Sequence, residues 1–257
     1  MSMPASPRLL VLDTATETVH LALATPDGVR ARAVDGGVRS SSTLLPTLQA
    51  LVAEAGLAWA DIDAVGFGQG PGAFTGLRTA CAVAQGLALG LGKPVLALDT
   101  LMAVAESACR ARPDIAQALQ APPATEPLWV LQDARMSEVY AAAYRRDTAQ
   151  GWTQVSAPVL WPLDYLQAQV REGRVRFAAG SALAAYPAAV EGLAGPADPR
   201  AQPDGEALAA LALAAWGRGE QLDPALALPL YVRDKVAQTT QERRDAAQAV
   251  ATGSLAT

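Results

Sequence analysis

The sequence contains a single histidine, His20, among its 257 residues. A Ser-His-Asp triad and a Cys-His pair would both depend on this one side chain, and an HExxH zinc site needs two histidines. His20 lies in the alternating segment 18–23, where Val19 and Leu21 share one face and His20 points to the other, as in an ordinary strand. We therefore predict no histidine-based catalysis and no histidine-ligated metal site in this chain.

Cysteine is also scarce, since Cys81 and Cys109 are the only two and no CxxC spacing occurs. This pattern favours neither a disulfide framework nor a zinc cluster. The most apolar stretch, residues 80–92, is shorter than the ~18 residues that indicate a membrane span. Residues 9–12 form too short an apolar run for the core of a signal peptide. We expect a reduced, soluble, cytoplasmic protein with no membrane association.

Basic residues are few, and nearly all of them are arginine, because Lys93 and Lys235 are the only lysines. The formal net charge is −5, whereas phosphate contacts need a dense basic surface. We expect the chain alone to bind nucleic acid poorly. Arg78, Arg135 and Arg233 remain available for a composite surface formed together with partners.

Apolar residues make up 51% of the chain and charged residues 18%, so a packed fold is expected over most of its length. The first half predicts three strands as an antiparallel meander, followed by alternating helices and strands. The predicted segments are strands at 9–13, 19–24 and 29–34, a helix at 40–55, a strand at 64–69, a helix at 74–91 and a strand at 94–98. This β-β-β-α-β-α-β order is typical of a ribonuclease-H-like α/β unit.

The second half repeats the opening of the first. Residues 128–133 are again an apolar strand that reaches an aspartate, and aligning Asp13 with Asp133 places Val19 on Val139 without a gap. Residues 113–127 read as a low-order stretch between two domains, and the polar tail beyond Gln238 is expected to be loosely held. Later segments predict strands near 138–144, 154–160 and 175–179, and helices near 163–170, 182–193 and 205–217.

Two turns carry the polar residues that suggest chemistry. Asp13-Thr14-Ala15-Thr16 follows the first strand, and a glycine-dense segment from Gly66 to Arg78 leads from a strand into a helix N-terminus, which favours anions. A phosphate turn usually needs glycine at the position of Ala15, and no lysine follows the later glycines as in a P-loop. Two interpretations stay open: tight structural turns, or a degenerate nucleotide site formed by Asp13, Thr14, Thr16, Gly70 and Gly72.

The helix predicted at 74–91 is more apolar than a surface helix requires. Its polar side chains Thr75, Arg78, Thr79 and Gln85 fall within a sector of roughly 120°, whereas a stripe of about 100° is enough to cover a sheet. Ala82, Gly86 and Gly90 add small residues that permit close approach of another backbone. Either the helix at 40–55 or another chain is expected to cover the excess apolar surface.

Five separated motifs follow one another along the chain: Leu12-Asp-Thr-Ala-Thr-Glu17, Gly68-Gln-Gly-Pro-Gly-Ala-Phe-Thr-Gly-Leu-Arg78, Ala84-Gln-Gly-Leu-Ala88, Asp133-Ala-Arg-Met136 with Glu138-Val-Tyr140, and Tyr231-Val-Arg233. Together, over residues 8–236, they resemble the TsaB family, also called YeaZ. The resemblance implies an α/β, actin-like (ASKHA) fold of two ribonuclease-H-like domains. We expect an N-terminal domain at 1–105, a C-terminal domain at 106–237 and a tail at 238–257.

The resemblance also implies a role in tRNA modification. In this family TsaB is a non-catalytic subunit that pairs with its paralogue TsaD, which transfers the threonylcarbamoyl group to N6 of adenosine 37 in tRNAs that read codons beginning with A. The ATPase TsaE joins them, and ATP or ADP and the metal belong to the partner subunits. TsaD uses an HxxxH metal pair, which this chain, with its lone histidine, lacks.

Family members pair through the first two helices of the N-terminal domain. The corresponding interface residues here are Thr47, Leu51, Glu54, Arg78, Thr79, Ala82, Val83 and Gly86. Pairing of the chain with itself when alone is an open alternative, and tRNA contact is expected only through the complex. The competing function is a small ATP-dependent phosphotransferase of the same architecture, using Asp13 and the turn at 68–72. A metalloprotease is disfavoured because the ligands for a metal are missing.

Overall fold

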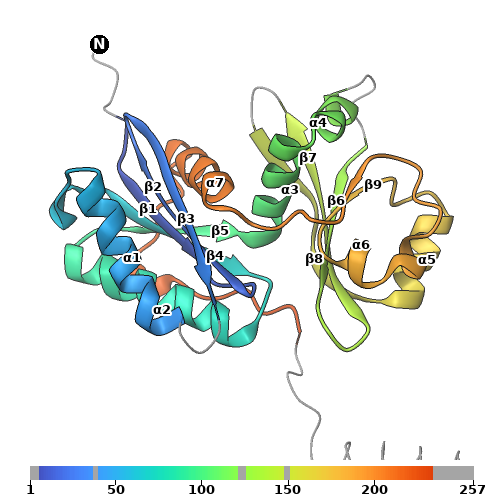
Figure 1. Ribbon diagram of the computed structural model, residues 1–257, viewed down its shortest axis with the longest axis horizontal. Coiled ribbons are helices and arrows are strands. Elements are labelled where there is room, and N and C mark those ends of the chain that lie inside the picture. Colours follow the sequence, from blue (N-terminus) through green and yellow to red (C-terminus); the bar gives the residue numbers. More distant parts are fainter. Residues whose placement is uncertain (1–5, 37–39, 121–125, 148–150, 234–257) are drawn as a thin grey trace, which may run out of the picture.

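The computed structural model describes residues 6–36, 40–120, 126–147 and 151–233. It consists of two five-stranded mixed sheets, each covered by helices, with α3 and α7 lying between them (Figure 1). The predicted fold class, two ribonuclease-H-like domains in an actin-like arrangement, is confirmed. The predicted tail at 238–257 lies outside the described residues.

The first sheet has the strand order β3-β2-β1-β4-β5. Its strands are β1 (Leu9–Asp13), β2 (Thr18–Thr25), β3 (Gly28–Asp35), β4 (Ala64–Gly70) and β5 (Val95–Asp99). β1 pairs antiparallel with β2 and β2 with β3, whereas β4 and β5 are added in parallel. The predicted antiparallel meander followed by alternating helices and strands is therefore confirmed, and the later strands pair in parallel.

The central strand β1 is buried on both faces because helices cover both sides of the sheet. Leu10 and Leu12 point toward α1 (Ser40–Glu54) and α2 (Phe74–Leu91). Leu9 and Val11 point the other way, toward α7 (Gly205–Gly217). A strand that alternates between two covered faces reads as a continuous apolar run, which is what residues 9–12 are.

The second sheet repeats this topology with the order β8-β7-β6-β9-β10. Its strands are β6 (Leu128–Asp133), β7 (Glu138–Asp147), β8 (Gly151–Pro162), β9 (Phe177–Ala179) and β10 (Ala197–Asp198). β6 and β7 pair antiparallel and β6 and β9 in parallel, as β1 does with β2 and β4. The repeat read from the sequence is structural, but the gapless alignment is one residue out at the turn, because Asp133 lies opposite Val139 whereas Asp13 lies opposite His20 and not Val19.

The described residues form further helical elements, and four of them, at 59–61, 100–111, 113–120 and 224–226, were not predicted from the sequence. The remaining helical elements are η2 (Trp59–Asp61), α3 (Thr100–Ala111), α4 (Pro113–Gln120), α5 (Leu163–Arg171), α6 (Ala182–Ala185), η3 (Pro187–Val190) and η4 (Pro224–Leu226). The prediction of low order from residue 113 was wrong for α4, in which Pro113 occupies the first position, where its missing N–H costs nothing. The single helix expected at 182–193 is two short ones.

α7 belongs to a different domain from the one predicted. Residues 205–217 were placed in the C-terminal domain, but in the structure they pack on β1, β2, β3 and β5 of the first sheet. The expected boundary between residues 105 and 106 also falls inside α3. That helix packs on β4 and β5 of the first sheet and on β6 and β7 of the second.

Partly buried polar contacts tie the two halves together through α3. Asp99, which caps α3, accepts a hydrogen bond from the Tyr144 hydroxyl at 2.6 Å, and Glu106 accepts one from the indole N–H of Trp152 at 2.7 Å. Asp99 and Glu106 belong to the first-domain side of the contact, whereas Tyr144 and Trp152 come from β7 and β8. Burial raises the pKa of Asp99 and pushes that of Tyr144 far above its usual value.

Candidate functional site

The first turn of the candidate site is held by hydrogen bonds to the carboxylate of Asp13, at the end of β1. Its Oδ1 accepts a hydrogen bond from the backbone N–H of Ala15 at 2.7 Å, and its Oδ2 accepts one from the hydroxyl of Thr100 at 2.7 Å. Asp13 is fully buried, and this burial raises its pKa despite the two hydrogen bonds. Thr100, which the sequence analysis did not single out, is therefore part of this turn.

The glycine-rich turn packs directly on the first turn. Thr100 Oγ1 accepts from the backbone N–H of Gly70 at 3.2 Å, and the Thr14 hydroxyl donates to the carbonyl of Gly76 at 2.6 Å. A Cβ on Gly68 would collide with the Asp13 carboxylate, and one on Gly76 would collide with the Thr14 carbonyl. Glycine is required at both positions, because the backbone lies against the Asp13 carboxylate at Gly68 and against the Thr14 backbone at Gly76.

The structure brings together all five residues proposed for a nucleotide, but it places them differently. Thr14, Thr16 and Gly72 line a cleft of ≈ 970 Å³ between the two sheets. Asp13 and Gly70 lie buried behind this lining. The hydroxyls of Thr14 and Thr16 donate to backbone carbonyls of the protein. These contacts support the structural interpretation of the turns, and a nucleotide in the cleft stays a prediction.

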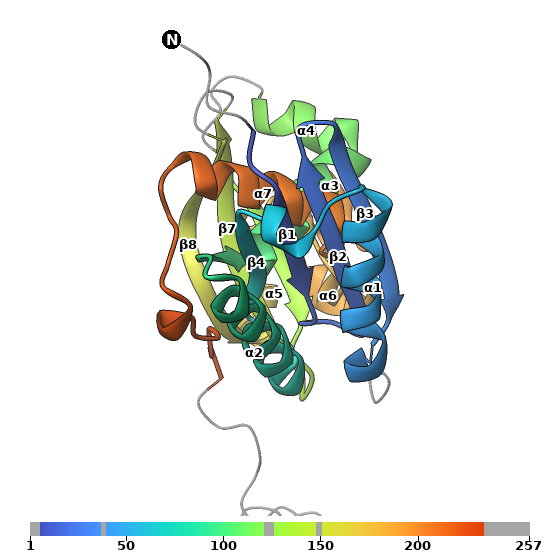
Figure 2. The ribbon, with the colours of Figure 1, turned by 90° about the vertical axis from the view of Figure 1, so that its left-hand side faces the viewer.

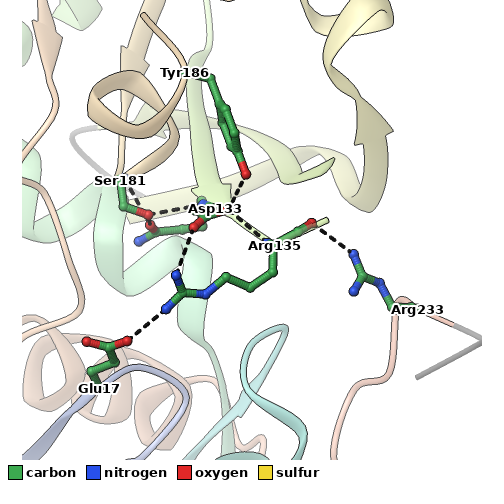
Figure 3. A network of polar contacts seen from close by, with 7 residues as sticks. Glu17, Asp133, Arg135, Ser181, Tyr186 and Arg233 are labelled. Atoms are coloured by element: carbon green, nitrogen blue, oxygen red, sulfur yellow. Dashed lines mark hydrogen bonds and ion pairs between the residues drawn. The ribbon is translucent and has the colours of Figure 1, made fainter. Parts of the chain in front are cut away.

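The second domain forms the opposite wall of the cleft through Asp133 (Figure 3). Asp133 Oδ1 accepts hydrogen bonds from the backbone N–H of Arg135 and from the Tyr186 hydroxyl, both at 2.8 Å, and its backbone N–H donates to Ser181 Oγ at 3.0 Å. The bond to Asp133 raises the pKa of Tyr186. Like Asp13, Asp133 is thus occupied in holding its own turn.

The turn that follows Asp133 is held in an uncommon conformation. Arg135, Met136 and Ser137 have φ angles of 63°, 57° and 57°, and non-glycine residues adopt such angles at a cost of about 1 kcal/mol or more each. The guanidinium of Arg233 bonds to the carbonyl of Arg135 at 3.4 Å and pairs with Glu138. Arg135 itself reaches across the cleft to Glu17 at 2.7 Å (Figure 3).

His20 lies in β2 as an ordinary strand residue, as expected. It is buried, its Nε2 has no hydrogen-bond partner, and burial lowers its pKa, which keeps the ring neutral. Within the described ranges, no three His, Cys, Asp or Glu side chains gather in a way that could hold a metal ion. No helix in that part of the chain is long and apolar enough to span a membrane.

The residues predicted for a partner interface do not all reach the surface. Ala82 and Gly86 are exposed on α2, and Val83 is half-buried against the core. Leu51 is fully buried in the core of the first domain, so its assignment to the interface is wrong for this chain as folded. Glu54 is exposed and pairs with Arg32 at 2.8 Å.

The two threonines among the predicted interface residues form hydrogen bonds within their own helices. Thr47 Oγ1 donates to the carbonyl of Thr43 at 2.8 Å, and Thr79 Oγ1 donates to the carbonyl of Thr75 at 2.9 Å. Neither bond removes the side chain from its helix face. Whether a partner contacts these residues stays a prediction.

A C-terminal segment covers one flank of α2. We call residues 222–233 the strap. The side-chain amide of Gln85 donates to the carbonyls of Pro224 and Ala227 at 3.0 and 3.2 Å, and Ala227 packs into the core beside α2. The apolar excess of α2 was expected to be covered by the helix at 40–55 or by another chain. The strap covers part of this surface, which was not predicted from the sequence.

The end of the strap also engages Arg78, another predicted interface residue. The Arg78 Nε–H donates to the Tyr231 hydroxyl at 3.1 Å, and its guanidinium lies 3.7 Å from the centre of the Phe74 ring. Phe74 and Tyr231 pack with their rings 5.1 Å apart. The motif Tyr231-Val-Arg233 therefore joins α2 to the Asp133 turn of the second domain.

Comparisons with known proteins place these features in a family. The family model described as TsaD, tRNA N6-adenosine threonylcarbamoyltransferase, matches residues 36–158. A tRNA threonylcarbamoyladenosine biosynthesis protein TsaB from Escherichia coli is 38% identical over 145 residues, and one from Haemophilus influenzae is 36% identical over 140 residues. These matches cover 56% and 54% of this chain, and they span only 58% and 54% of the two relatives.

Similarity in structure extends over more of the chain. The solved structure of YeaZ from Pseudomonas aeruginosa superposes with a TM-score of 0.73 at 32% sequence identity, covering 88% of this chain and 99% of the other. An identity of this size over nearly the whole of a solved chain reflects common descent. This chain belongs to the TsaB (YeaZ) family.

Proposed function

We propose that this chain is a non-catalytic subunit that pairs with a TsaD-type transferase and supports threonylcarbamoyl transfer to N6 of adenosine 37 of tRNA. The family membership supports the pathway, because relatives carry the name of threonylcarbamoyladenosine biosynthesis proteins. In this proposal TsaE joins the pair, and ATP or ADP and the metal are held by the partner subunits.

The observation that carries the pairing is the outer face of α2. Gly86 and Gly90 are exposed, and a Cβ at either position would meet no atom within 4 Å. With exposed Ala82 they form a smooth helix surface that a second helix backbone can approach closely. Bare small-residue surface gains little from contact with water and much from van der Waals contact with a partner.

The non-catalytic role is supported by how the polar residues of the turns are used. Asp13 is fully buried with a hydrogen bond on each carboxylate oxygen, and Asp133 is bonded within its own turn. The one histidine of the sequence is buried in β2. These polar groups are used in internal contacts, which is consistent with a subunit that binds a partner and supplies no reacting group.

Light scattering on a sizing column, with tRNA modification assayed on the peak, tests this function. We expect a one-to-one complex of this chain with TsaD, active once TsaE and the adenylate substrate are supplied, from two chains that are inactive apart. Failure to bind TsaD, together with ATP hydrolysis by this chain alone, would instead support the phosphotransferase alternative.

A charge on the outer face of α2 sharpens the test. Val83→Glu should abolish pairing, but Val83 is half-buried, so Ala82→Glu at an exposed position is the cleaner variant. Ala214→Glu, at an exposed alanine of α7 on the other side of the first sheet, is the matched control. Pairing that survives Ala82→Glu would move the interface away from α2.

A further inference from the structure

The strap is held beside α2 partly by its backbone, and the side chains of Leu226 and Leu228 remain largely exposed. Two of its carbonyls accept hydrogen bonds from Gln85, and the backbone N–H of Leu230 donates to the carbonyl of Gln69 at 2.7 Å. In Figure 2 the strap descends beside α2, on the side opposite α1. The segment is therefore a fixed part of the surface that surrounds α2.

The strap exposes large apolar side chains next to α2. The exposed fractions are 68% for Leu226, 72% for Leu228 and 44% for Tyr231, and Leu89 of α2 is 63% exposed. Leu89 lines a shallow groove together with Leu222 and Pro224, which connects the helix surface to the strap. Single exposed leucines are ordinary, but several gathered on one rim of a helix mark a contact surface.

We propose that the strap is part of the partner-binding face, and that Leu226 and Leu228 pack against the transferase-family chain that binds α2. This inference rests on the proposed function, whose interface it extends from two helices to three adjacent segments. The apolar rim is continuous with the small-residue face of Ala82 and Gly86 through Leu89, which lies on the turn of α2 that follows Gly86. A partner helix that covers that face would meet the strap leucines at its edge.

The partner chemistry follows from the family match. The transferase model aligns with residues 36–158, which include α1 and α2, so a transferase-family chain carries its own version of this helix pair. The strap, at 222–233, lies outside that match. Pairing of two related helix pairs is nearly symmetric, and the strap adds apolar contact on this chain's side that the shared helices do not supply.

The test is the double variant Leu226→Ser/Leu228→Ser, with affinity for TsaD measured by titration calorimetry. Burial of two leucines predicts a rise in Kd of about 30-fold or more when both are lost. The control is Val155→Ser/Leu213→Ser, which removes two exposed aliphatic side chains on β8 and α7 and should leave Kd unchanged. Thermal unfolding of the strap variant should match that of the parent chain, since Leu226 and Leu228 are largely exposed.

Three other outcomes are informative. If the strap variant binds TsaD as tightly as the parent while Ala82→Glu does not bind, the strap inference is wrong and the proposed function stands. If the parent chain itself fails to bind TsaD, the proposed function fails, and the strap inference, which rests on it, is overturned as well. If the strap variant weakens only self-association, with Kd for TsaD unchanged, the rim serves a second copy of this chain and the inference is overturned.

Discussion

Asp13→Ala separates the two interpretations of the first turn. The substitution removes the acceptor for the backbone N–H of Ala15 and for the hydroxyl of Thr100, both of which are buried. A buried donor left without a partner costs about 1–3 kcal/mol, so the free energy of unfolding should fall by about 2–6 kcal/mol. Urea unfolding should show a lower midpoint with an unchanged m-value, since the same surface is exposed on unfolding.

Asp13→Asn is the control for this variant. The side-chain carbonyl still accepts from Ala15, and only the contact with Thr100 must rearrange, so the loss at pH 7 should be smaller than for alanine. Burial raises the folded-state pKa of Asp13. The stability that its neutral form contributes is therefore complete below the unfolded pKa of about 3.9 and is lost as the pH rises through the folded pKa. Asn does not titrate. The difference in the free energy of unfolding between the parent and Asp13→Asn should therefore be smallest at neutral pH and larger in acid.

The refuting result concerns function as well as stability. If Asp13→Ala unfolds like the parent chain, the two hydrogen bonds do not hold the turn. If that stable variant also yields an assembled complex that fails to modify tRNA, Asp13 contacts a ligand and the nucleotide interpretation returns. A folded Asp13→Asn variant with full activity of the assembled complex would support the structural interpretation.

Three further predictions concern stability. Gly68→Ala should lower the free energy of unfolding by about 3 kcal/mol, measured by urea titration, because the added methyl group collides with the Asp13 carboxylate. His20 has a lowered folded pKa, so its stabilising effect is present above the unfolded pKa of about 6.5 and is lost as the pH falls through the folded value; the midpoint of urea unfolding should fall between pH 7.5 and 5.5 in the parent but less in His20→Gln. Tyr144→Phe should cost about 1.5–3 kcal/mol in thermal or urea unfolding, because it leaves the buried Asp99 without its 2.6 Å hydrogen bond; an unchanged midpoint would mean that this contact between the domains adds no stability.

Strong apolar patterns made much of the fold predictable. The helices at 74–91 and 205–217 begin and end where the sequence indicates. Gly92, with a φ of 64°, supplies the left-handed residue that ends α2, and Asp204 caps α7 through the backbone N–H of Ala207. The alignment of Asp13 with Asp133 predicted the start of the second sheet, because the strands that end at these residues are both buried and therefore both apolar.

The missed features share a physical cause, which is that several surfaces compete for one segment. α3 contacts both domains, and the apolar side chains that it buries belong to two separate core clusters. Leu51 lies on the apolar stripe of α1, and a residue that fills the core cannot also face a partner. The strap has no periodicity because several of its contacts are made by backbone groups, which any sequence provides.

The position of α7 has a consequence for the order in which the chain can fold during synthesis. All five strands of the first sheet are complete once residue 99 has been made, yet the face formed by Leu9, Val11 and Ala22 is covered by a helix that begins at Gly205. Until that helix emerges from the ribosome, the nascent first domain carries an open apolar face. The first domain to be made is thus the last to be finished, and a fragment ending near residue 105 would expose that face and aggregate.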